Sequence, residues 1–375
     1  MAKDPLSGRG ARTNASGRFE RFSTEAFDDG WGGAELTPLE TIVTPELAKT
    51  IISTNQSPDI SFDQSINPYR GCEHGCIYCY ARPNHAYVGL SPGLDFETKL
   101  FVKANAAELL EQEFSKPSYK PRTIMLGGVT DIYQPIERGY GVTRALLEVM
   151  ERWRHPVALI TKSQLVIRDI DILARLAERG LAKAAISVTT MQRRTARVME
   201  PRAAAPHRRI EVIRMLAQAG VPVTVMVAPI VPAINDSEIE AILEECKKAG
   251  ASSSGYVVLR LPLEIKDLFR EWLNQYYPDR ATRVMAIVRQ MRGGRDYDPE
   301  WGKRQKGEGP YAKMIADRFA TACRRLGLDK PRLPLDHTQF RRPLEAGGQA
   351  DLFAEPESAP LRAVAEEREA FDGDK

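Results

Sequence analysis

The amino-acid sequence predicts an α/β fold, a partial (β/α)6 barrel of TIM type with a helical C-terminal subdomain and flexible termini. Apolar runs alternate with amphipathic helical stretches between about residues 59 and 265, which is the pattern of repeated βα units. The apolar runs are continuous, as expected for parallel strands that are buried on both faces. Gly220 and Gly250 stand where two of the helical stretches end. A doubly wound sheet built from the same units is the alternative.

Six strands are expected in chain order. They are a short first strand and five longer apolar runs, at Ser65–Pro68, Thr123–Gly128, Val157–Thr161, Ala184–Thr189, Val223–Ala228 and Tyr256–Leu261. Helical periodicity fills four of the intervals, at Thr143–Trp153, Val166–Arg179, His207–Ala219 and Ser237–Ala249. In such a barrel the loops that follow the strands meet at one face, where ligands bind. The sequence therefore predicts a functional site in these loops.

Composition divides the chain into four parts. Residues 1–58 are predicted to be a flexible N-terminal arm and lead-in, because residues 1–35 are rich in Gly, Arg, Ser and Asp and show no periodicity. Residues 59–265 hold the core domain. Residues 266–344 are helical and charged and are assigned to a basic C-terminal subdomain. Residues 345–375 are acidic and predict a disordered tail.

Charge and cysteine content narrow the class of protein. The 375 residues carry 53 Lys and Arg and 50 Asp and Glu, and a net charge of +3 neither indicates nor excludes a nucleic-acid partner. No run of about 18 apolar residues is present, which excludes a membrane-spanning helix, and the N-terminus lacks the apolar segment of a secretory signal. The five cysteines are an odd number, which argues against a disulfide framework. A cytoplasmic protein is expected.

Three of the cysteines, Cys72, Cys76 and Cys79, lie together in the loop after the first predicted strand. Thiolates with this C-x3-C-x2-C spacing can each hold one iron of a [4Fe–4S] cluster and leave the fourth iron open to another ligand. Gly71 and Gly75 let the backbone turn tightly around such a group. The spacing therefore predicts an iron–sulfur cluster.

The alternatives are a structural zinc site and a chance grouping of cysteines. Structural zinc takes four protein ligands. Within the loop only His74 remains as a fourth ligand, and it lies awkwardly between two of the cysteines. Cys246 and Cys323 are isolated in helical stretches and are typical of core thiols. The cluster is the favoured interpretation.

The spacing Cys-x3-Cys-x-Tyr-Cys, with Tyr78 in the aromatic position, resembles the signature of the radical S-adenosylmethionine (SAM) superfamily. The resemblance implies that SAM chelates the open iron through its amino and carboxylate groups. It implies further that an electron from the cluster cleaves SAM to methionine and a 5′-deoxyadenosyl radical, and that Tyr78 lies near the adenine. In such an enzyme the protein orients the cofactors and excludes water.

Residues at three further strand ends suit a SAM site of this family. Gly127 and Gly128 let the backbone approach the methionine part of SAM, and Thr130 is expected to hydrogen-bond it. Lys162 is placed to pair with the SAM carboxylate. Ser187 ends the fourth strand with a hydroxyl group. The alternatives are an ordinary turn, a solvated lysine and hydroxyls that serve the local backbone.

Within the superfamily, the sequence resembles the branch of spore photoproduct lyase and DNA-repair-photolyase-like proteins over about residues 65–265. The strings Cys-Ile-Tyr-Cys-Tyr, Thr130-Asp131 and Thr161-Lys162 carry this resemblance. It makes Tyr80, which matches a tyrosine in the cluster loop of that lyase, a candidate catalytic residue. That lyase also has a hydrogen-donating cysteine near the end of its second strand, and Met125–Asp131 contain none. A true photoproduct lyase is therefore disfavoured.

Nucleic acid, with DNA favoured, is the predicted substrate class. Aromatic residues suited to base stacking lie among basic ones in the C-terminal region, at Tyr297, Trp301 and Tyr311. The basic residues are Arg292, Arg295, Lys303, Arg304, Lys306, Arg324, Arg325, Lys330, Arg332, Arg341 and Arg342. A solvated basic face is the alternative. In the tail, Gln349–Phe353 resembles the bacterial sliding-clamp-binding pentapeptide.

The sequence thus predicts a cytoplasmic radical SAM enzyme that acts on nucleic acid in a repair-like reaction. A reductase or flavodoxin-type protein is its expected electron donor, and no membrane partner is expected. Radical modification of RNA or of a protein side chain is the alternative reaction. A non-catalytic, metal-bearing module that binds nucleic acid is the alternative from another class.

Overall fold

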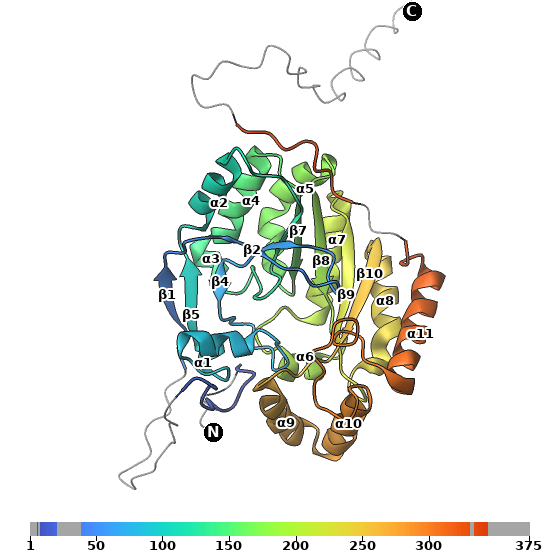
Figure 1. Cartoon of the computed structure of the whole chain (residues 1–375). Helices are drawn as coiled ribbons and strands as arrows, with labels where there is room; N and C mark the ends of the chain where they lie inside the picture. The colour runs from blue at the N-terminus through green and yellow to red at the C-terminus, as the bar shows by residue number, and fades with distance from the viewer. Residues whose placement is uncertain (1–5, 7, 21–38, 331–333, 344–375) are drawn as a thin grey trace, which may run out of the picture. The chain divides into compact units, whose positions relative to one another are not determined.

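The main element of the computed structural model is a curved sheet of seven strands (Figure 1). The structure describes residues 6, 8–20, 39–330 and 334–343. Six neighbouring strands are parallel, in the order β3-β6-β7-β8-β9-β10. They span Gln64–Ile66, Ile124–Leu126, Val157–Thr161, Ala182–Ser187, Val223–Ile230 and Ser253–Val258. These are the six strands that the sequence predicts, in the predicted order, so the partial barrel is confirmed.

Helices connect the parallel strands and cover the outer face of the sheet (Figure 1). The connecting helices are α2 (Ala106–Ser115), α3 (Glu137–Tyr140), α4 (Val142–Arg152), η2 (Gln164–Asp169), α5 (Ile170–Glu178), α6 (Arg193–Met199), α7 (Pro206–Gln218), η3 (Asp236–Glu238) and α8 (Ile239–Lys248). Gly220 and Gly250 follow α7 and α8 with φ of +78° and +104°, the left-handed conformation of a C-terminal glycine. Both helices therefore end where the sequence predicts.

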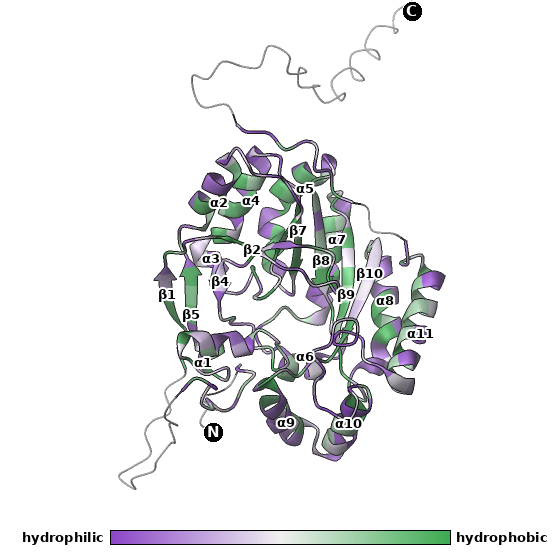
Figure 2. Cartoon of the chain, in the orientation of Figure 1, coloured by the Kyte–Doolittle hydropathy of each residue, from purple (hydrophilic) through white to green (hydrophobic). Residues whose placement is uncertain are grey.

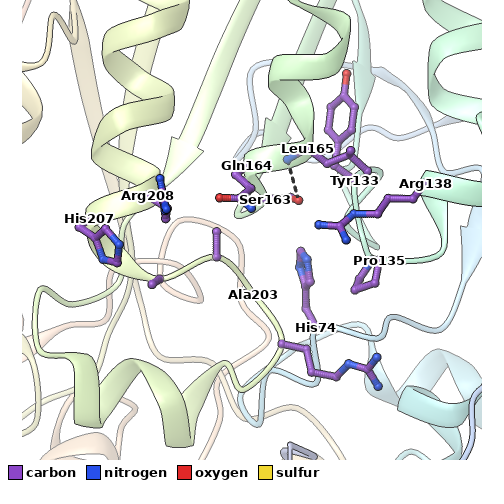
Figure 3. A pocket seen from close by; sticks show the side chains of 13 residues that line it. His74, Tyr133, Pro135, Arg138, Ser163, Gln164, Leu165, Ala203, His207 and Arg208 are labelled. Atoms are coloured by element: carbon purple, nitrogen blue, oxygen red, sulfur yellow. Dashed lines mark hydrogen bonds between the residues drawn. The ribbon is translucent and has the colours of Figure 1, made fainter.

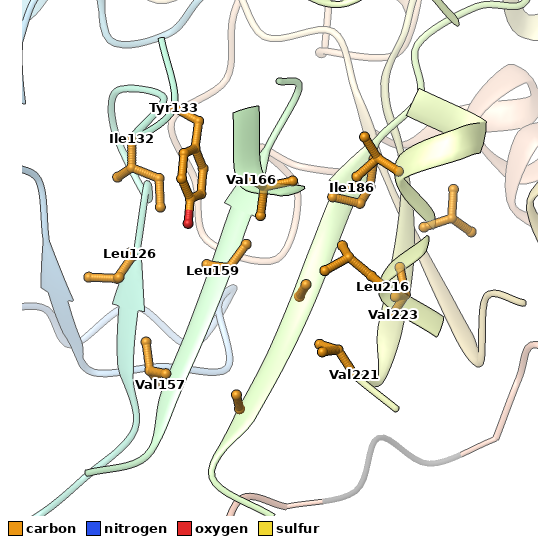
Figure 4. Packing of buried hydrophobic residues seen from close by; sticks show 14 of the residues in the cluster. Leu126, Ile132, Tyr133, Val157, Leu159, Val166, Ile186, Leu216, Val221 and Val223 are labelled. Carbon is orange, nitrogen blue, oxygen red and sulfur yellow. The ribbon is translucent and has the colours of Figure 1, made fainter. Parts of the chain in front are cut away.

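The main hydrophobic core lies between the sheet and these helices. Leu126, Leu159, Ile186 and Val223 come from four neighbouring strands, and Leu216 of α7 packs among them (Figure 4). Apolar residues run along β7 and β9, whereas β10 is more polar (Figure 2). Each fully buried side chain of this kind stabilises the fold by roughly 1.5–3 kcal/mol. The core thereby fixes the ends of the strands from which the site loops start.

A second, smaller sheet was not predicted from the sequence. Its strands are β1 (Ile42–Glu46), β5 (Lys99–Lys103) and β4 (Tyr69–Arg70), in the order β1-β5-β4. In the main sheet, β2 (Ile52–Thr54) pairs antiparallel with β3, and this strand was not predicted either. These strands are short, and β1 contains Pro45, which is tolerated at a sheet edge but weakens a strand signal.

Three helices follow β10, namely α9 (Ile265–Tyr276), α10 (Pro278–Gln290) and α11 (Gly309–Leu326). Phe269 and Trp272 of α9 share a hydrophobic core with Ile77 of the cysteine loop. The Trp272 indole N–H donates to the Val198 carbonyl oxygen at 2.9 Å. The sequence set these helices apart as a subdomain, and in the structure they are packed against the elements that hold the site. No helix among the described residues is long and apolar enough to cross a membrane.

The N-terminal residues 8–20 lie against the segment that follows the cysteines. The Gly10 and Ala11 amides donate to the two carboxylate oxygens of Glu97 at 2.9 and 2.8 Å. Arg9 is buried and donates to the Glu97 carbonyl oxygen at 3.0 Å. The sequence predicted a flexible arm here because no local periodicity reveals a contact with a residue 86–88 positions away. The structure corrects that prediction for Arg9, Gly10 and Ala11.

Replacement of Glu97 by Gln is expected to lower the free energy of unfolding by about 3 kcal/mol, because a buried arginine, Arg82, loses its counter-charge. The N-terminal residues should also become cleavable by trypsin at Arg9 or Arg12, since an amide side chain cannot accept both main-chain hydrogen bonds. Urea denaturation and limited proteolysis measure the two effects.

The matched control is Glu46→Gln, which removes an exposed carboxylate paired with Arg70 at 2.9 Å. Exposed pairs contribute less than about 1 kcal/mol, so this variant should unfold near the wild-type urea concentration. Equal protease resistance of Glu97→Gln and wild type would contradict the proposed role of Glu97.

Candidate functional site

The cysteine loop, residues 71–82, is folded around one buried arginine. A guanidinium group has five N–H donors, and all five of Arg82 are used. One donates to the Glu97 carboxylate at 2.5 Å. The others donate, at 2.9–3.1 Å, to the carbonyl oxygens of Gly75, Cys76, Pro92 and Gly93. Arg82 therefore fixes the main-chain path between the second and third cysteines.

The three cysteines of this loop lie in successive tight turns. Cys72 and Cys76 are buried and Cys79 is partly buried. Main-chain hydrogen bonds from Gly75 to Cys72 and from Cys79 to Cys76 close successive turns. Gly75 has a φ of +65°, and a Cβ atom there would lie 2.7 Å from the Glu97 carboxylate. Glycine is thus required for the loop to pack against Glu97.

The thiols lie in surroundings that disfavour charge unless a cation is present. Burial raises the pKa of all three, to about 12 for Cys76. The negative charges of Asp131 and of the other two thiolates raise the pKa of Cys72 further. Main-chain amides oppose this effect, that of Asp131 at Cys72 and that of Ala81 at Cys79. Amide donors directed at sulfur are a feature of iron–sulfur sites, so the residues present fit such a cluster.

The arrangement of these side chains does not match a site for a single metal ion. Among the described residues, no three or more His, Cys, Asp or Glu side chains form a group that could hold one metal ion. In a cubane cluster each thiolate binds a different iron, so its ligands need not surround one point. His74, the fourth zinc ligand that the loop could offer, contacts Asp131 instead, with 3.3 Å between Nδ1 and Oδ2.

A buried ion pair holds Tyr78. The Tyr78 hydroxyl donates to Glu200, which also accepts a hydrogen bond of 2.6 Å from Thr189 and pairs with Arg209. Burial raises the pKa of Glu200, but the charges of Arg209 and Lys162 outweigh burial, and the pKa is lowered. The sequence analysis found Tyr78 and missed Glu200 and Arg209. Glu200 is 122 residues from Tyr78 and lies in a segment without a recognisable motif.

Lys162 follows β7 directly and brings a positive charge to the cysteines. Its Nζ lies 5.9 Å from the centre of the Tyr78 ring. Burial lowers the pKa of Lys162, and the charges of Cys76, Glu200 and Asp131 more than compensate, so the pKa is raised. No described residue accepts a hydrogen bond from its Nζ or forms an ion pair with it. The ammonium group is therefore charged and available to a ligand.

Asp131 links the loops after β6 and β7. It accepts hydrogen bonds from Thr161 Oγ1 at 2.6 Å and from the Lys162 amide at 2.8 Å, and it contacts His74. Burial raises the pKa of Asp131, but His74 and these hydrogen bonds lower it well below its usual range. The sequence placed Asp131 at a strand end without a role. In the structure it holds Lys162 in position and directs its own amide at Cys72.

Two other strand-end residues named from the sequence make contacts within the chain. Thr130 Oγ1 donates to the Tyr69 carbonyl oxygen at 3.0 Å. Gly127 has a φ of +85°, and a Cβ there would lie 2.6 Å from the Ile160 carbonyl oxygen of β7. Gly127 thus serves the close approach of two strands, and the Thr130 hydroxyl tethers the β6 loop to the lead-in of the cysteine loop.

The remaining residues lie at the far side of the cysteine loop. The Ser187 carbonyl oxygen accepts a hydrogen bond of 3.1 Å from Arg209, and the Gly128 carbonyl oxygen accepts one from the Tyr80 hydroxyl. The Tyr80 ring is 43% exposed, and the Arg260 guanidinium carbon lies 5.1 Å from its centre. Arg260 follows β10, so it connects the last strand to the cysteine loop. The sequence analysis missed it.

Comparison with known proteins shows the family of this chain. The sequence pattern of the Radical SAM superfamily matches residues 66–246, which contain the cysteine loop and β6 to α8. An uncharacterized protein of Mycobacterium tuberculosis, Rv2578c, is 32% identical over 299 residues, which are 78% of this chain and 83% of that protein. The chain belongs to the radical SAM superfamily. A more distant relative in Methanocaldococcus jannaschii, MJ0683, is 26% identical over 232 residues, 62% of this chain and 82% of that protein.

Solved structures show the same radical SAM fold. Spore photoproduct lyase complexed with dinucleoside spore photoproduct has a TM-score of 0.54 at 17% identity, covering 76% of this chain and 79% of the lyase. A mutant of spore photoproduct lyase gives 0.53 at 18% identity with the same coverage. This likeness is one of fold. Radical SAM enzymes use a [4Fe–4S] cluster and SAM, and the chain is an enzyme of this class.

Replacement of Glu200 by Gln is expected to lower the free energy of unfolding by about 3 kcal/mol at neutral pH, because Arg209 stays buried without its counter-charge. The folded-state pKa of Glu200 is below its unfolded value of 4.5, so its stabilisation is present above that pH and is lost as the pH falls through the folded pKa. Urea denaturation of both proteins at a series of pH values should show a difference that shrinks in acid.

The control for this effect is Glu211→Gln, since Glu211 forms an exposed pair with Arg214. That variant should differ from wild type by less than about 1 kcal/mol at every pH. A Glu200→Gln difference that stays constant from neutral pH into acid would show that the charge of Glu200 is not what stabilises the site.

Proposed function

We propose that Cys72, Cys76 and Cys79 each bind one iron of a [4Fe–4S] cluster and that SAM binds at the fourth iron. The position of the three thiols in one tightly folded loop, with amides directed at two of them, carries this proposal. When bound, the reduced cluster supplies an electron to SAM, whose cleavage yields methionine and a 5′-deoxyadenosyl radical. The chain's own residues bind and orient the two groups.

Lys162 is the proposed partner of the SAM carboxylate. Its ammonium group is charged, half-buried and without a hydrogen-bond or ion-pair partner among the described residues, so an anionic ligand gains a charge-assisted hydrogen bond there. Asp131 positions Lys162 through the main chain. Tyr78 offers its ring to the adenine, and Glu200 holds that ring in place.

The other predicted contacts are proposed to line the same site through their main chain. Gly127, Gly128 and Thr130 form the β6 loop, and Ser187 ends β8. The Thr130 hydroxyl is hydrogen-bonded to the Tyr69 carbonyl oxygen and is not free for SAM. This loop is therefore proposed to shape the SAM site with its main chain rather than to bind SAM with a side chain. Tyr80 is proposed as the catalytic residue that faces the substrate, because its ring is exposed beside Cys79.

We propose nucleic acid, with DNA favoured, as the substrate class. The support comes from exposed arginines that pair with no described residue, and these lie on α6 at Arg193, Arg194 and Arg197. The α6 helix is in the loop region after β8, on the site face of the sheet. Such arginines are typical of a surface that contacts phosphates.

The C-terminal basic region contributes less than the sequence suggested. Arg304 pairs with Asp59, Arg325 with Glu244, and Arg292 is buried with its guanidinium on main-chain carbonyls. Tyr311 donates to Asp236 at 2.5 Å. These groups are held within the protein, so the proposed interface centres on α6.

Two proposed partners rest on the sequence. The clamp-binding string Gln349–Phe353 and the whole tail, residues 345–375, lie outside the described residues, as does Arg332. A reductase or flavodoxin-type donor is proposed because SAM cleavage needs an electron. A cytoplasmic location remains a proposal as well.

The proposed reaction does not include a cysteine that donates hydrogen to the substrate. All five cysteines are described, and the two outside the loop are core residues: Cys246 is buried in α8, and Cys323 in α11 lies 3.0 Å from Ser254 Oγ. The β6 loop, where the photoproduct lyases carry that thiol, has none. We therefore propose a radical modification or repair that ends with a different hydrogen source.

Reconstitution with iron and sulfide under anaerobic conditions tests the cofactor assignment. The wild type should gain the visible absorption of thiolate-bound iron and cleave SAM after reduction with dithionite. Cys76→Ala should lose both, and Cys246→Ala should keep both because its thiol is remote from the loop. Lys162→Met should keep the absorption and raise the SAM concentration needed for half-maximal cleavage roughly tenfold. SAM cleavage by Cys76→Ala at the wild-type rate would sink the ligand assignment.

Binding of oligonucleotides over a range of salt concentrations tests the substrate class. The double variant Arg193→Gln/Arg197→Gln should bind more weakly, with a salt slope smaller by about 1–2 than that of the wild type. Arg325→Gln, an arginine already paired with Glu244, is the control and should keep the wild-type slope. If neither DNA nor RNA binds, or if the control loses as much affinity, α6 is not a nucleic-acid surface.

A further inference from the structure

A cavity of about 320 Å³ lies beside the cysteine loop, on the side of His74 (Figure 3). Its walls come from the loops after β6, β7 and β8 and from the first turn of α7. This size suits a small ligand or one unit of a larger one. None of the roles proposed above uses it.

Cationic side chains surround this cavity. Arg138 reaches in from α3, with its guanidinium directed toward Ser163 (Figure 3). Arg208 and His207 stand at the start of α7. Among the described residues, neither their side chains nor the guanidinium group of Arg138 has a hydrogen-bond or ion-pair partner. Arg202 lies 3.2 Å from Glu73. The cavity therefore has more positive charge than the protein neutralises.

The main chain adds to this charge. The N-cap of α7 is Ala205, which has no side-chain oxygen to accept the first amides of the helix. Pro206 lacks an N–H group, and within the described residues no carbonyl accepts the His207 amide. Ala203, Ala204 and Ala205 line the cavity with small side chains and leave it open. An uncapped helix start of this kind favours an anion.

A buried imidazole stands independently of that helix. His74 is 2% exposed, and its ring projects into the cavity between Arg138 and Ala203 (Figure 3). Its Nδ1 contacts Asp131, and its Nε2 has no partner among the described residues. The ring thus forms the wall of the cavity on the side of the cysteine loop, and its Nε2 is open to a polar group of a ligand.

We propose that this cavity binds a phosphate group, carried either by a nucleic-acid strand or by a free nucleotide. The free guanidinium groups of Arg138 and Arg208, together with the His207 amide, offer more donors than the two oxygens of a carboxylate can accept, and they suit the several oxygens of a phosphate. The two nearby carboxylates do not compete for these donors, since Glu73 is held by Arg202 and Thr41, and Asp131 by His74 and Thr161.

The location gives the pocket a role in the proposed reaction. His74 lies between two proposed cluster ligands, and Asp131, on which it rests, holds the Lys162 amide. His74 and Asp131 therefore connect a phosphate in the pocket to the proposed SAM site. The next step rests on the proposed nucleic-acid function. In that function the pocket binds a backbone phosphate near the nucleotide that reacts. The binding of phosphate itself does not depend on that function.

Direct binding to the reconstituted holoenzyme tests the pocket. The probes are a fluorescent 5′-mononucleotide, the same nucleoside without phosphate, inorganic phosphate as competitor, and a single-stranded oligonucleotide. The 5′-mononucleotide should bind, phosphate should displace it, and the nucleoside should bind at least tenfold more weakly. Arg138→Gln and Arg208→Gln should each weaken nucleotide binding roughly tenfold. Arg214→Gln, on the same helix but outside the cavity and paired with Glu211, is the matched control.

The outcomes separate the pocket from the proposed function. Equal binding of nucleotide and nucleoside, or equal losses in Arg208→Gln and Arg214→Gln, overturns the pocket. Losses with the oligonucleotide that parallel those with the mononucleotide identify a strand phosphate. Losses with the mononucleotide alone identify a free nucleotide, so the pocket stands while its link to a nucleic-acid substrate fails. The folded state of each variant is checked by urea denaturation, which should match the wild type because both side chains are exposed.

Discussion

The buried guanidinium of Arg82 is the contact on which the site depends. All five of its N–H donors form hydrogen bonds, to the cysteine loop, to the segment after it and to Glu97. A loop of this length has few main-chain hydrogen bonds of its own, and three thiolates in a buried region repel one another. The guanidinium group of Arg82 meets both needs. Its planar donors satisfy carbonyl oxygens that would otherwise be buried without partners, and its positive charge offsets the repulsion. A lysine could not replace it, since three donors from one nitrogen cannot span the same set of acceptors.

A second balance of charge lies across the loop. Glu200 and Asp131 are buried carboxylates with lowered pKa values, and Arg209, Lys162 and His74 face them. Arg209 is fully committed to Glu200 and to main-chain oxygens, whereas Lys162 is not. The protein therefore fixes its permanent charges in pairs and leaves one ammonium group for an incoming ligand. A preorganised group of this kind costs no rearrangement when the ligand binds.

Much of the fold and part of the site could be predicted from the sequence, because the signals are local. The apolar runs gave the strands of the barrel, and the spacing of Cys72, Cys76 and Cys79 indicated the cluster. Glu200 and Arg209 could not be found in this way, since their partner Tyr78 is over a hundred positions away and a single Glu or Arg carries no pattern. In the basic C-terminal region, distant partners were missed as well. Arg304 and Arg325 look like free charges in the sequence, because Asp59 and Glu244 reach them only in the folded chain.

The contact between the N-terminal residues and the cysteine loop has a thermodynamic consequence. Gly10 packs so closely on the Gly75 carbonyl group that no side chain could be accommodated there. The amides of Gly10 and Ala11 donate to the Glu97 carboxylate, which pairs with Arg82. The docking of residues 9–11 and the conformation of the loop are thus linked equilibria. Linkage is reciprocal. If the docked segment raises the affinity of the loop for a bound group by some factor, the bound group raises the equilibrium constant for docking of the segment by the same factor. Residues 9–11, which precede the cysteine loop in the chain, are in this way coupled to the loading of the site.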